Sequence, residues 1–296
     1  MLSIFTVGAR HYPYQQTPAS LGDILMLELG WFSTGRGEGS RGLLQAAVEA
    51  IQRGHLKAHI RFVFCNREPG EHEGSDRFMA LVRAYGIPLL TLSSRRFRRD
   101  LGAPSIDAVR LDYDRAVLRL IEPYNPQLVV LAGYMLIVGP ELCRRYPMLN
   151  LHPALPDGPQ GTWQGVIWAL IGQRAGDSGA MVHLATEEVD RGPAITYVRF
   201  PIQGGRFSPL WEQVAGLTVE EMQRRWGEEL PLFQAIRQEG VRRERPLLVE
   251  TLRAFAEGRI LLVGGRPVRA DGKPLPLCLN RVVERVLGKQ EAGPTG

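Results

Sequence analysis

Apolar segments alternate along the chain with amphipathic ones, as in proteins whose strands are each followed by a helix. Short apolar runs predict strands at residues 27–32, 60–64, 88–92, 127–132, 148–151, 180–185, 195–202 and 259–263. Apolar residues spaced by three and four predict helices at residues 43–51, 78–85, 110–121, 162–170 and 246–258. The run at 127–132 is typical of a strand buried on both faces of a parallel sheet. The pattern predicts a single doubly wound, mainly parallel α/β domain over residues 27–285.

Three segments depart from this alternation. Residues 1–26 show no strand or helix pattern, and we expect them to form an N-terminal arm. Residues 203–240 carry apolar residues at helical spacing among many charges, which indicates a helical insertion. Residues 286–296 are polar, and we expect a frayed tail. Two shorter stretches, 95–99 and 264–276, predict a solvated basic loop and a hairpin-like end to the domain.

Composition narrows the function classes. The 296 residues are 44% hydrophobic and 23% charged, as in an ordinary globular protein. The formal charge of +5 suits a phosphorylated small substrate and gives no reason to expect nucleic acid as a partner. The three cysteines, Cys65, Cys143 and Cys278, lie far apart without metal-ligand spacing, so we expect no metal and a reduced, cytoplasmic compartment. No apolar run approaches the ~20 residues that span a bilayer, so no membrane partner is expected.

Polar side chains end two of the predicted strands. Asn150 and His152 are two residues apart, so they point to the same face of an extended strand. Asp190 lies in the polar turn after the strand at 180–185. When an amine attacks an acyl carbon, an amide and an imidazole can donate to the carbonyl oxygen, and a carboxylate can orient the imidazole and relay the amine's proton through water. Each motif alone is also typical of a strand end or turn that only satisfies local backbone groups.

A glycine-rich turn at residues 35–42 connects the first strand to the first helix. Such a turn lets backbone N–H groups approach a phosphate at the helix N-terminus. The spacing that binds dinucleotides is present only in part. The second strand ends in Cys65-Asn66-Arg67 rather than in an acid, which argues against NAD.

Taken together, the segments Asn150-Leu151-His152-Pro153, His183 and Thr186 to Pro193 resemble the signature of the folate-dependent formyltransferases. The resemblance extends from about residue 27 to about residue 279. It implies a formyltransferase that uses 10-formyltetrahydrofolate as co-substrate and the amine of glycinamide ribonucleotide as acceptor. It also implies that Asn150, His152 and Asp190 are the catalytic residues.

The resemblance implies further roles at matching positions. For the acceptor and its phosphate it implicates Gly39, Ser40, Arg41, Arg110 and His183. For the folate it implicates Met135, Leu136, Ile137, Val138, Thr186 and Glu187. The resemblance also implies that a glutamate in the helix following the insertion contacts the acceptor, and Glu239 and Glu244 both compete for this role.

The chain departs from the family pattern at two places that bear on its substrates. Leu136 stands where the family commonly has an arginine, and the histidines that recognise the acceptor are missing from residues 154–170. Other acceptors therefore remain open: an amino sugar nucleotide, methionyl-tRNA, or water, as in a hydrolase. A non-catalytic module that binds a phosphate or nucleotide is the alternative outside enzymes. The expected partners are small molecules, and a homodimer stays open.

Overall fold

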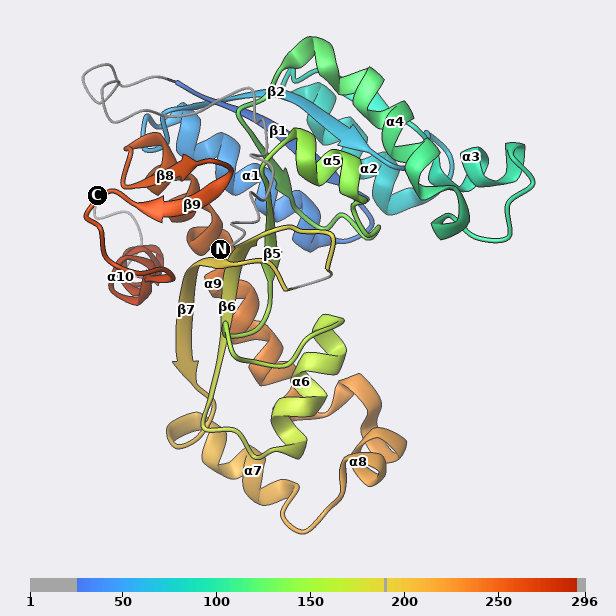
Figure 1. The fold of residues 1–296 in the computed structure, drawn as a ribbon. Helices are drawn as coiled ribbons and strands as arrows, with labels where there is room; N and C mark the ends of the chain where they lie inside the picture. Colours follow the sequence, from blue (N-terminus) through green and yellow to red (C-terminus); the bar gives the residue numbers. More distant parts are fainter. Residues whose placement is uncertain (1–25, 189–190, 292–296) are drawn as a thin grey trace, which may run out of the picture.

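An eight-stranded, mainly parallel sheet organises the chain (Figure 1). The computed structural model describes residues 26–188 and 191–291, so the predicted arm lies almost wholly outside the described residues. The strands of the sheet lie in the order β10-β7-β6-β5-β4-β1-β2-β3. Their bounds are β1 Leu27–Ser33, β2 Ala58–Cys65, β3 Leu89–Thr91, β4 Leu128–Leu131, β5 Met148–His152, β6 Asp177–Leu184, β7 Ala194–Pro201 and β10 Leu277–Cys278. Among these strands β6 runs antiparallel to its neighbours. The predicted fold class is confirmed.

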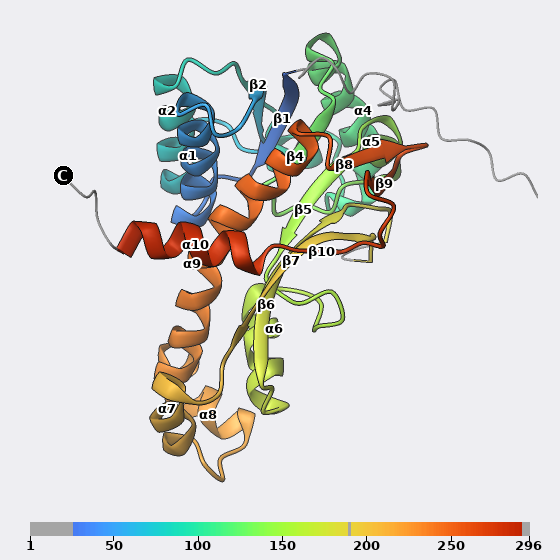
Figure 2. The same ribbon diagram turned by 90° about the vertical axis from the view of Figure 1, so that its left-hand side faces the viewer.

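Helices cover both faces of the sheet (Figure 2). The helices of the described residues are α1 Glu38–Gln52, α2 Glu73–Ala84, α3 Ser94–Asp100, α4 Arg110–Ile121, α5 Pro140–Arg145, α6 Trp163–Gly172, α7 Ser208–Gln213, α8 Val219–Trp226, α9 Pro231–Ala256 and α10 Asn280–Glu291. Helices α1, α2, α9 and α10 pack on one face, and α4 and α5 pack on the other. Adjacent strand residues point to opposite faces, so Trp31 enters the first core and Phe32 the second. None of the described helices has the length and hydrophobicity that a bilayer crossing requires.

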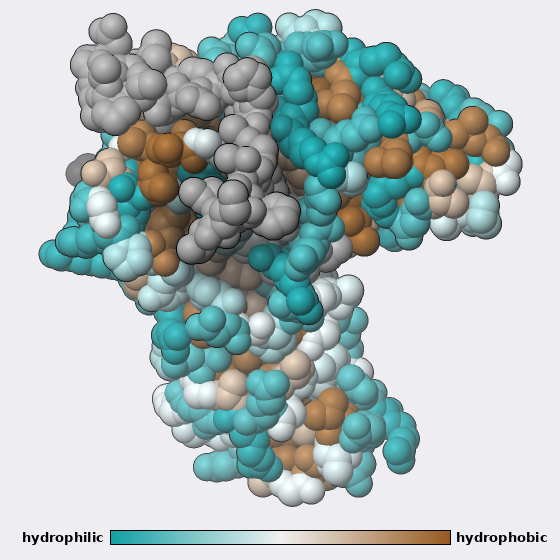
Figure 3. Space-filling model, viewed as in Figure 1, coloured by the Kyte–Doolittle hydropathy of each residue, from teal (hydrophilic) through white to brown (hydrophobic). Residues whose placement is uncertain are grey.

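A helical lobe projects from the sheet domain (Figure 3). It consists of α6, α7, α8 and the first half of α9, with its own buried apolar cluster. Phe233 lies at the centre of this cluster, with ring centroids 5.8 Å from Trp163 and 4.9 Å from Trp168. The predicted helical pattern of residues 203–240 therefore corresponds to real helices.

The helix predicted at 246–258 starts much earlier than expected. The sequence predicted a helix from Pro246 to Gly258, ended by the glycine. In the structure α9 begins at Pro231 and passes through Pro246. A proline inside a helix costs about 3 kcal/mol. Burial of apolar side chains on both sides of it, such as Phe233 and Leu252, offsets that cost.

Three other boundaries differ from the prediction. The basic run at 95–99 forms α3 rather than a loop, because the Ser93 hydroxyl caps its N-terminus and Phe97 packs against Tyr113. Residues 286–291 of the expected tail belong to α10, in which Leu287 is buried, and the rest of the tail lies outside the described residues. The closing hairpin pairs β8, Ile260–Val263, with β9, Arg266–Arg269. Both glycines of its turn have positive φ, as the tightest hairpin turns require.

The far edge of the sheet is completed by β10 and the residues after it. β10 pairs with β7 through only two residues. The side chain of Asn280 continues the pairing, because its Nδ2 donates to the Arg199 carbonyl at 2.5 Å and its Oδ1 accepts from the Arg199 N–H at 2.9 Å. An amide side chain here stands in for the next residue of a strand.

Asp114 of α4 supports the loop that follows β4. Its carboxyl is buried beside the backbone amides of Gly139 and Leu142, at the start of α5. A side chain at Gly139 would collide with it. Burial raises the pKa of Asp114 from its ordinary 3.8 to about 7, although Arg110 and the two amides act in the opposite direction.

Replacing Asp114 with asparagine should flatten the pH dependence of stability. Between about pH 4 and pH 7 the folded protein holds a proton that the unfolded chain has lost, so the free energy of unfolding falls as the pH rises. Each unit of pKa difference corresponds to about 1.4 kcal/mol. Urea unfolding at the two ends of this range should show a loss of a few kcal/mol in the wild type that Asp114→Asn largely avoids. Equal losses in the two proteins would contradict the assignment.

Candidate active site

The candidate site lies at the carboxyl ends of the central strands β1, β4 and β5. Two hydrogen bonds join the turns after β1 and β4. The Thr34 N–H donates to the Gly133 carbonyl at 3.0 Å, and the Met135 N–H donates to the Thr34 hydroxyl at 2.8 Å. Open parallel sheets bind ligands at this edge. The contacts bring the glycine-rich turn and the loop after β4 into one rim.

The predicted pair Asn150 and His152 lies in the C-terminal half of β5. β6 runs antiparallel to β5 and places His183 directly opposite Asn150. The Asn150 Nδ2 lies 3.1 Å from the His183 Nε2. The rings of His152 and His183 lie nearly perpendicular, with centroids 6.3 Å apart. Three of the predicted site residues therefore form one contiguous group.

The neighbours of His183 assign its proton and orient the amide. The His183 Nδ1 lies 3.1 Å from the Leu184 carbonyl oxygen, which can only accept a hydrogen bond. In the neutral ring the proton is therefore on Nδ1, and Nε2 accepts from the Asn150 NH2 group. This assignment turns the amide nitrogen of Asn150 toward His183. The buried His183 thus fixes the orientation of the Asn150 NH2 group, which is the group that would donate to a carbonyl oxygen.

His152 is also held by a carbonyl. It is only 3% exposed, and its Nε2 lies 3.1 Å from the carbonyl oxygen of Pro159. Since that oxygen can only accept, the His152 Nε2 carries a proton. The segment from Pro153 to the start of α6 therefore folds back over the imidazole. A substrate oxygen that uses this proton would have to replace the Pro159 contact.

The loop from 185 to 193 joins β6 to β7, and the predicted catalytic Asp190 lies outside the described residues. The base of the loop is closed by the Leu184 N–H, which donates to the Pro193 carbonyl at 3.0 Å. Any side chain at Gly192 would collide with the Leu184 carbonyl, which explains the glycine. The placement of Asp190 against His152 stays a prediction.

The two folate candidates of this loop have partners within the protein. The Thr186 hydroxyl donates to the Glu188 carbonyl at 3.0 Å. The exposed carboxylate of Glu187 pairs with Arg144 of α5 at 2.8 Å. This ion pair ties the loop to α5, which follows the other predicted folate segment. Their predicted role toward the folate remains untested.

The phosphate candidates Gly39, Ser40 and Arg41 lie in the first turn of α1 rather than in the preceding loop. The helix begins at Glu38, five residues before the apolar pattern starts, because its first turn has almost no apolar side chains to reveal it. No side chain caps the N-terminus at Gly37, so no capping oxygen occupies the first N–H groups. Ser40 is buried against Gly133, whereas Arg41 is partly exposed and ion-paired with no other described residue. This turn can receive an anion.

The predicted folate loop presents apolar side chains at the rim. Met135 and Ile137 are 66% and 47% exposed, which is high for large apolar residues, while Leu136 is half-buried and Val138 is buried. Arg110 had been assigned to the acceptor phosphate. The structure instead places its guanidinium on the Ile137 carbonyl and the Asp107 carboxylate. Arg110 therefore supports this loop in the described structure.

Sequence reasoning missed Arg67, which follows the end of β2. Its side chain is 8% exposed, and its Nη1 donates to the Ser94 hydroxyl at 3.2 Å. Its Nε is buried without a partner among the described residues. Burial lowers the pKa of Arg67, and the nearby Arg95 and Arg36 lower it further. An arginine directly after an apolar strand, at the carboxyl edge of the sheet, was the signal that could have identified it.

Both glutamates considered for the acceptor lie on α9 and are paired with arginines. Glu239 contacts Arg206, Arg242 and Arg243, and these partners hold its pKa below the usual value despite burial. Glu244 accepts from Arg237 at 2.8 Å. The described residues contain no group of three or more His, Cys, Asp or Glu side chains that could hold a metal ion.

Known proteins are similar in sequence to the part of the chain that contains this site. Residues 36–206 match the family model described as formyl transferase, which is more than half of the chain. The phosphoribosylglycinamide formyltransferase of Escherichia coli is 33% identical over 175 residues, covering 57% of this chain and 71% of the relative. That of Schizosaccharomyces pombe is 32% identical over 174 residues, covering 55% and 79%.

Solved structures share the fold. The phosphoribosylglycinamide formyltransferase of Coxiella burnetii has a TM-score of 0.62 at 25% identity, covering 86% of this chain and 99% of that one. A formyltetrahydrofolate deformylase of Pseudomonas syringae pv. tomato has a TM-score of 0.57 at 21% identity, covering 83% and 66%, which shows the fold alone. With its sheet, its Asn150–His152 strand and its match to the family model, the chain belongs to the formyl transferase family and is a formyltransferase.

Proposed function

We propose that the enzyme transfers the formyl group of 10-formyltetrahydrofolate to the amine of glycinamide ribonucleotide. The relatives that carry this activity in their names support the choice of acceptor. The observation that carries the chemistry is the group formed by Asn150, His183 and His152. Two donors at the end of β5 are held in place there: His183 holds the Asn150 NH2 group, and the Pro159 carbonyl holds the His152 Nε2–H.

In the transfer, one bond from the formyl carbon to nitrogen forms and another breaks. The acceptor nitrogen forms a bond to the formyl carbon and loses a proton, while the bond from that carbon to N10 of the folate breaks and N10 gains a proton. Negative charge develops on the formyl oxygen between these events. The Asn150 NH2 group and the His152 Nε2–H would donate to that oxygen, the latter after exchanging its contact with Pro159. Asp190, at the position the family motif gives, would orient His152 and relay the proton.

The rim around this group offers complementary places for both substrates. The first turn of α1 with Ser40 and Arg41 would take the acceptor's phosphate. The exposed Met135 and Ile137 would pack against the flat pteridine ring. Arg67 is a buried cation on the same edge and would balance a carboxylate or phosphate of either substrate.

Removing the amide donor tests the proposal directly. Asn150→Ala should lower kcat by roughly 10²–10³-fold, the cost of losing one donor to the developing oxyanion. Formation of tetrahydrofolate is measured with both substrates present. Gln223→Ala, on exposed α8, is the control and should keep wild-type turnover.

The same assay without an acceptor separates transfer from hydrolysis. Formyltetrahydrofolate consumption that needs no ribonucleotide would assign water as the acceptor and overturn the choice of glycinamide ribonucleotide. Full turnover by Asn150→Ala would overturn the catalytic assignment itself.

Replacing Arg41 should affect binding of the acceptor rather than the chemical step. A hydrogen bond to a charged group contributes about 1.5–3 kcal/mol, so Arg41→Gln should raise the KM for glycinamide ribonucleotide by roughly 10–100-fold with little change in kcat. Arg53→Gln, in the exposed region at the other end of α1, is the matched control. Equal kinetics in the two variants would remove Arg41 from the phosphate site.

His183 should act as a positioning residue for Asn150. His183→Ala frees the amide, and misplacing a catalytic group by about 1 Å can cost roughly 100-fold, so we expect a large fall in kcat with both KM values nearly unchanged. His183→Gln retains an acceptor oxygen for the Asn150 NH2 group and should recover part of the loss. A rise in KM without a fall in kcat would instead indicate direct substrate contact.

A further inference from the structure

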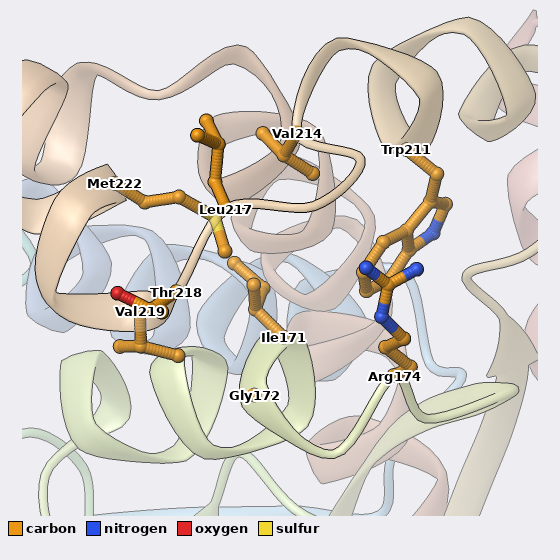
Figure 4. A pocket seen from close by; sticks show the side chains of 9 residues that line it. All are labelled: Ile171, Gly172, Arg174, Trp211, Val214, Leu217, Thr218, Val219 and Met222. Atoms are coloured by element: carbon orange, nitrogen blue, oxygen red, sulfur yellow. The ribbon is translucent and has the colours of Figure 1, made fainter.

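A cavity of about 260 Å³ lies inside the helical lobe (Figure 4). One wall comes from the end of α6 and the turn after it, and the other from α7, α8 and the segment between them. The lining residues are Ile171, Gly172, Arg174, Trp211, Val214, Leu217, Thr218, Val219 and Met222. Most of them are apolar, as expected of a small-molecule site.

Arg174 is the charged residue among those that line the cavity. In Figure 4 its side chain projects toward the Trp211 ring at one end of the cavity. The indole is fixed there, because its Nε1 donates to the Ile202 carbonyl at 2.5 Å. The Arg174 guanidinium forms no ion pair with any described residue. The chamber, lined mostly by apolar residues, thus ends at an exposed arginine that has no counter-charge among the described residues.

The backbone conformation at Arg174 is one that glycine adopts more easily than arginine. Arg174 follows α6 with φ of 47°, in the left-handed region that glycine usually occupies after a helix. Its N–H donates to the Ile171 carbonyl and the Ala175 N–H to the Leu170 carbonyl, which closes the helix end. These bonds use only the backbone, so the helix end itself does not require arginine. A non-glycine residue kept in this conformation points to a role for its side chain.

One wall of the cavity lies within the match to the family model and the other lies beyond it. The family match ends at residue 206, so α6 lies within it, while Trp211 and the rest of the second wall lie beyond it. The chamber lies where α7, α8 and the segment between them face the end of α6. It lies at the end of α6 that is opposite to the segment covering His152.

We propose that this cavity binds a small organic monocarboxylate with a compact apolar body. The body fills the space between Ile171, Leu217 and Met222, and the carboxylate pairs with Arg174 beside the Trp211 ring. A carboxylate matches the planar guanidinium with two parallel hydrogen bonds. The size of the cavity restricts the body to about one ring or a short branched chain. The site is independent of the formyl transfer proposed above.

Phenylacetate and its uncharged isostere phenylacetamide test the proposal. Titration calorimetry on the full chain should show phenylacetate binding at least roughly tenfold more tightly than the amide, because only the acid supplies the counter-charge. Binding should also change the fluorescence of Trp211. The wild-type protein alone can overturn the proposal, if it does not bind phenylacetate or binds the acid and the amide with equal affinity.

Two substitutions locate the site. Arg174→Gly should abolish the preference for the acid while unfolding at the same or a higher temperature, since glycine suits the left-handed backbone better. Val214→Phe should fill the chamber and abolish binding of both compounds. Arg224→Gln, on the exposed side of α8, is the control and should bind like the wild type. Preserved acid preference in Arg174→Gly would refute the role of Arg174. Formyl transfer can be measured separately, so failure of one proposal does not decide the other.

Discussion

The antiparallel pairing of β5 with β6 is the constraint on which the active site depends. It places Asn150 across from His183 and thereby fixes the direction of the amide nitrogen. A register shift of one residue would turn Asn150 and His152 to the opposite face of the sheet. Because β6 runs against its neighbours, its last residues lie beside the start of β5, where Leu184 is opposite Leu149 and the Ala185 N–H donates to the Met148 carbonyl at 2.7 Å.

The helix α9 contributes side chains to two hydrophobic cores, one in the helical lobe and one in the sheet domain. Its first turns pack Phe233 into the helical lobe, and its later turns pack Leu252 against the sheet. Between these apolar ends lies a buried ion-pair network, in which Arg243 contacts Glu239 on its own helix and Glu284 of α10. Breaking one partner of a buried pair leaves an uncompensated charge, which is strongly destabilising. The lobe and the sheet domain therefore share one long helix whose middle depends on charge pairing.

The sequence predicted the features that follow from local periodicity. The period of two along β5 was enough to place Asn150 and His152 on one face, and apolar runs located the parallel strands. It could not predict contacts between segments that are distant in the chain. The predicted role of Arg110 at a phosphate stays a prediction, and the sequence did not reveal that its guanidinium contacts the Ile137 carbonyl, 27 residues away in the chain. Arg67 looked like an ordinary polar strand end, because only the structure shows that it is buried and donates to the Ser94 hydroxyl.

The Asn280 side chain also determines how two copies of the sheet could join. By bonding both backbone groups of Arg199 it covers the outer edge of β7, so a second chain finds no vacant ladder positions at that residue. At the opposite border β3 provides only three residues, too few for a lasting strand-to-strand junction between protomers. The two borders of the eight-stranded sheet therefore offer little free backbone for strand pairing between copies.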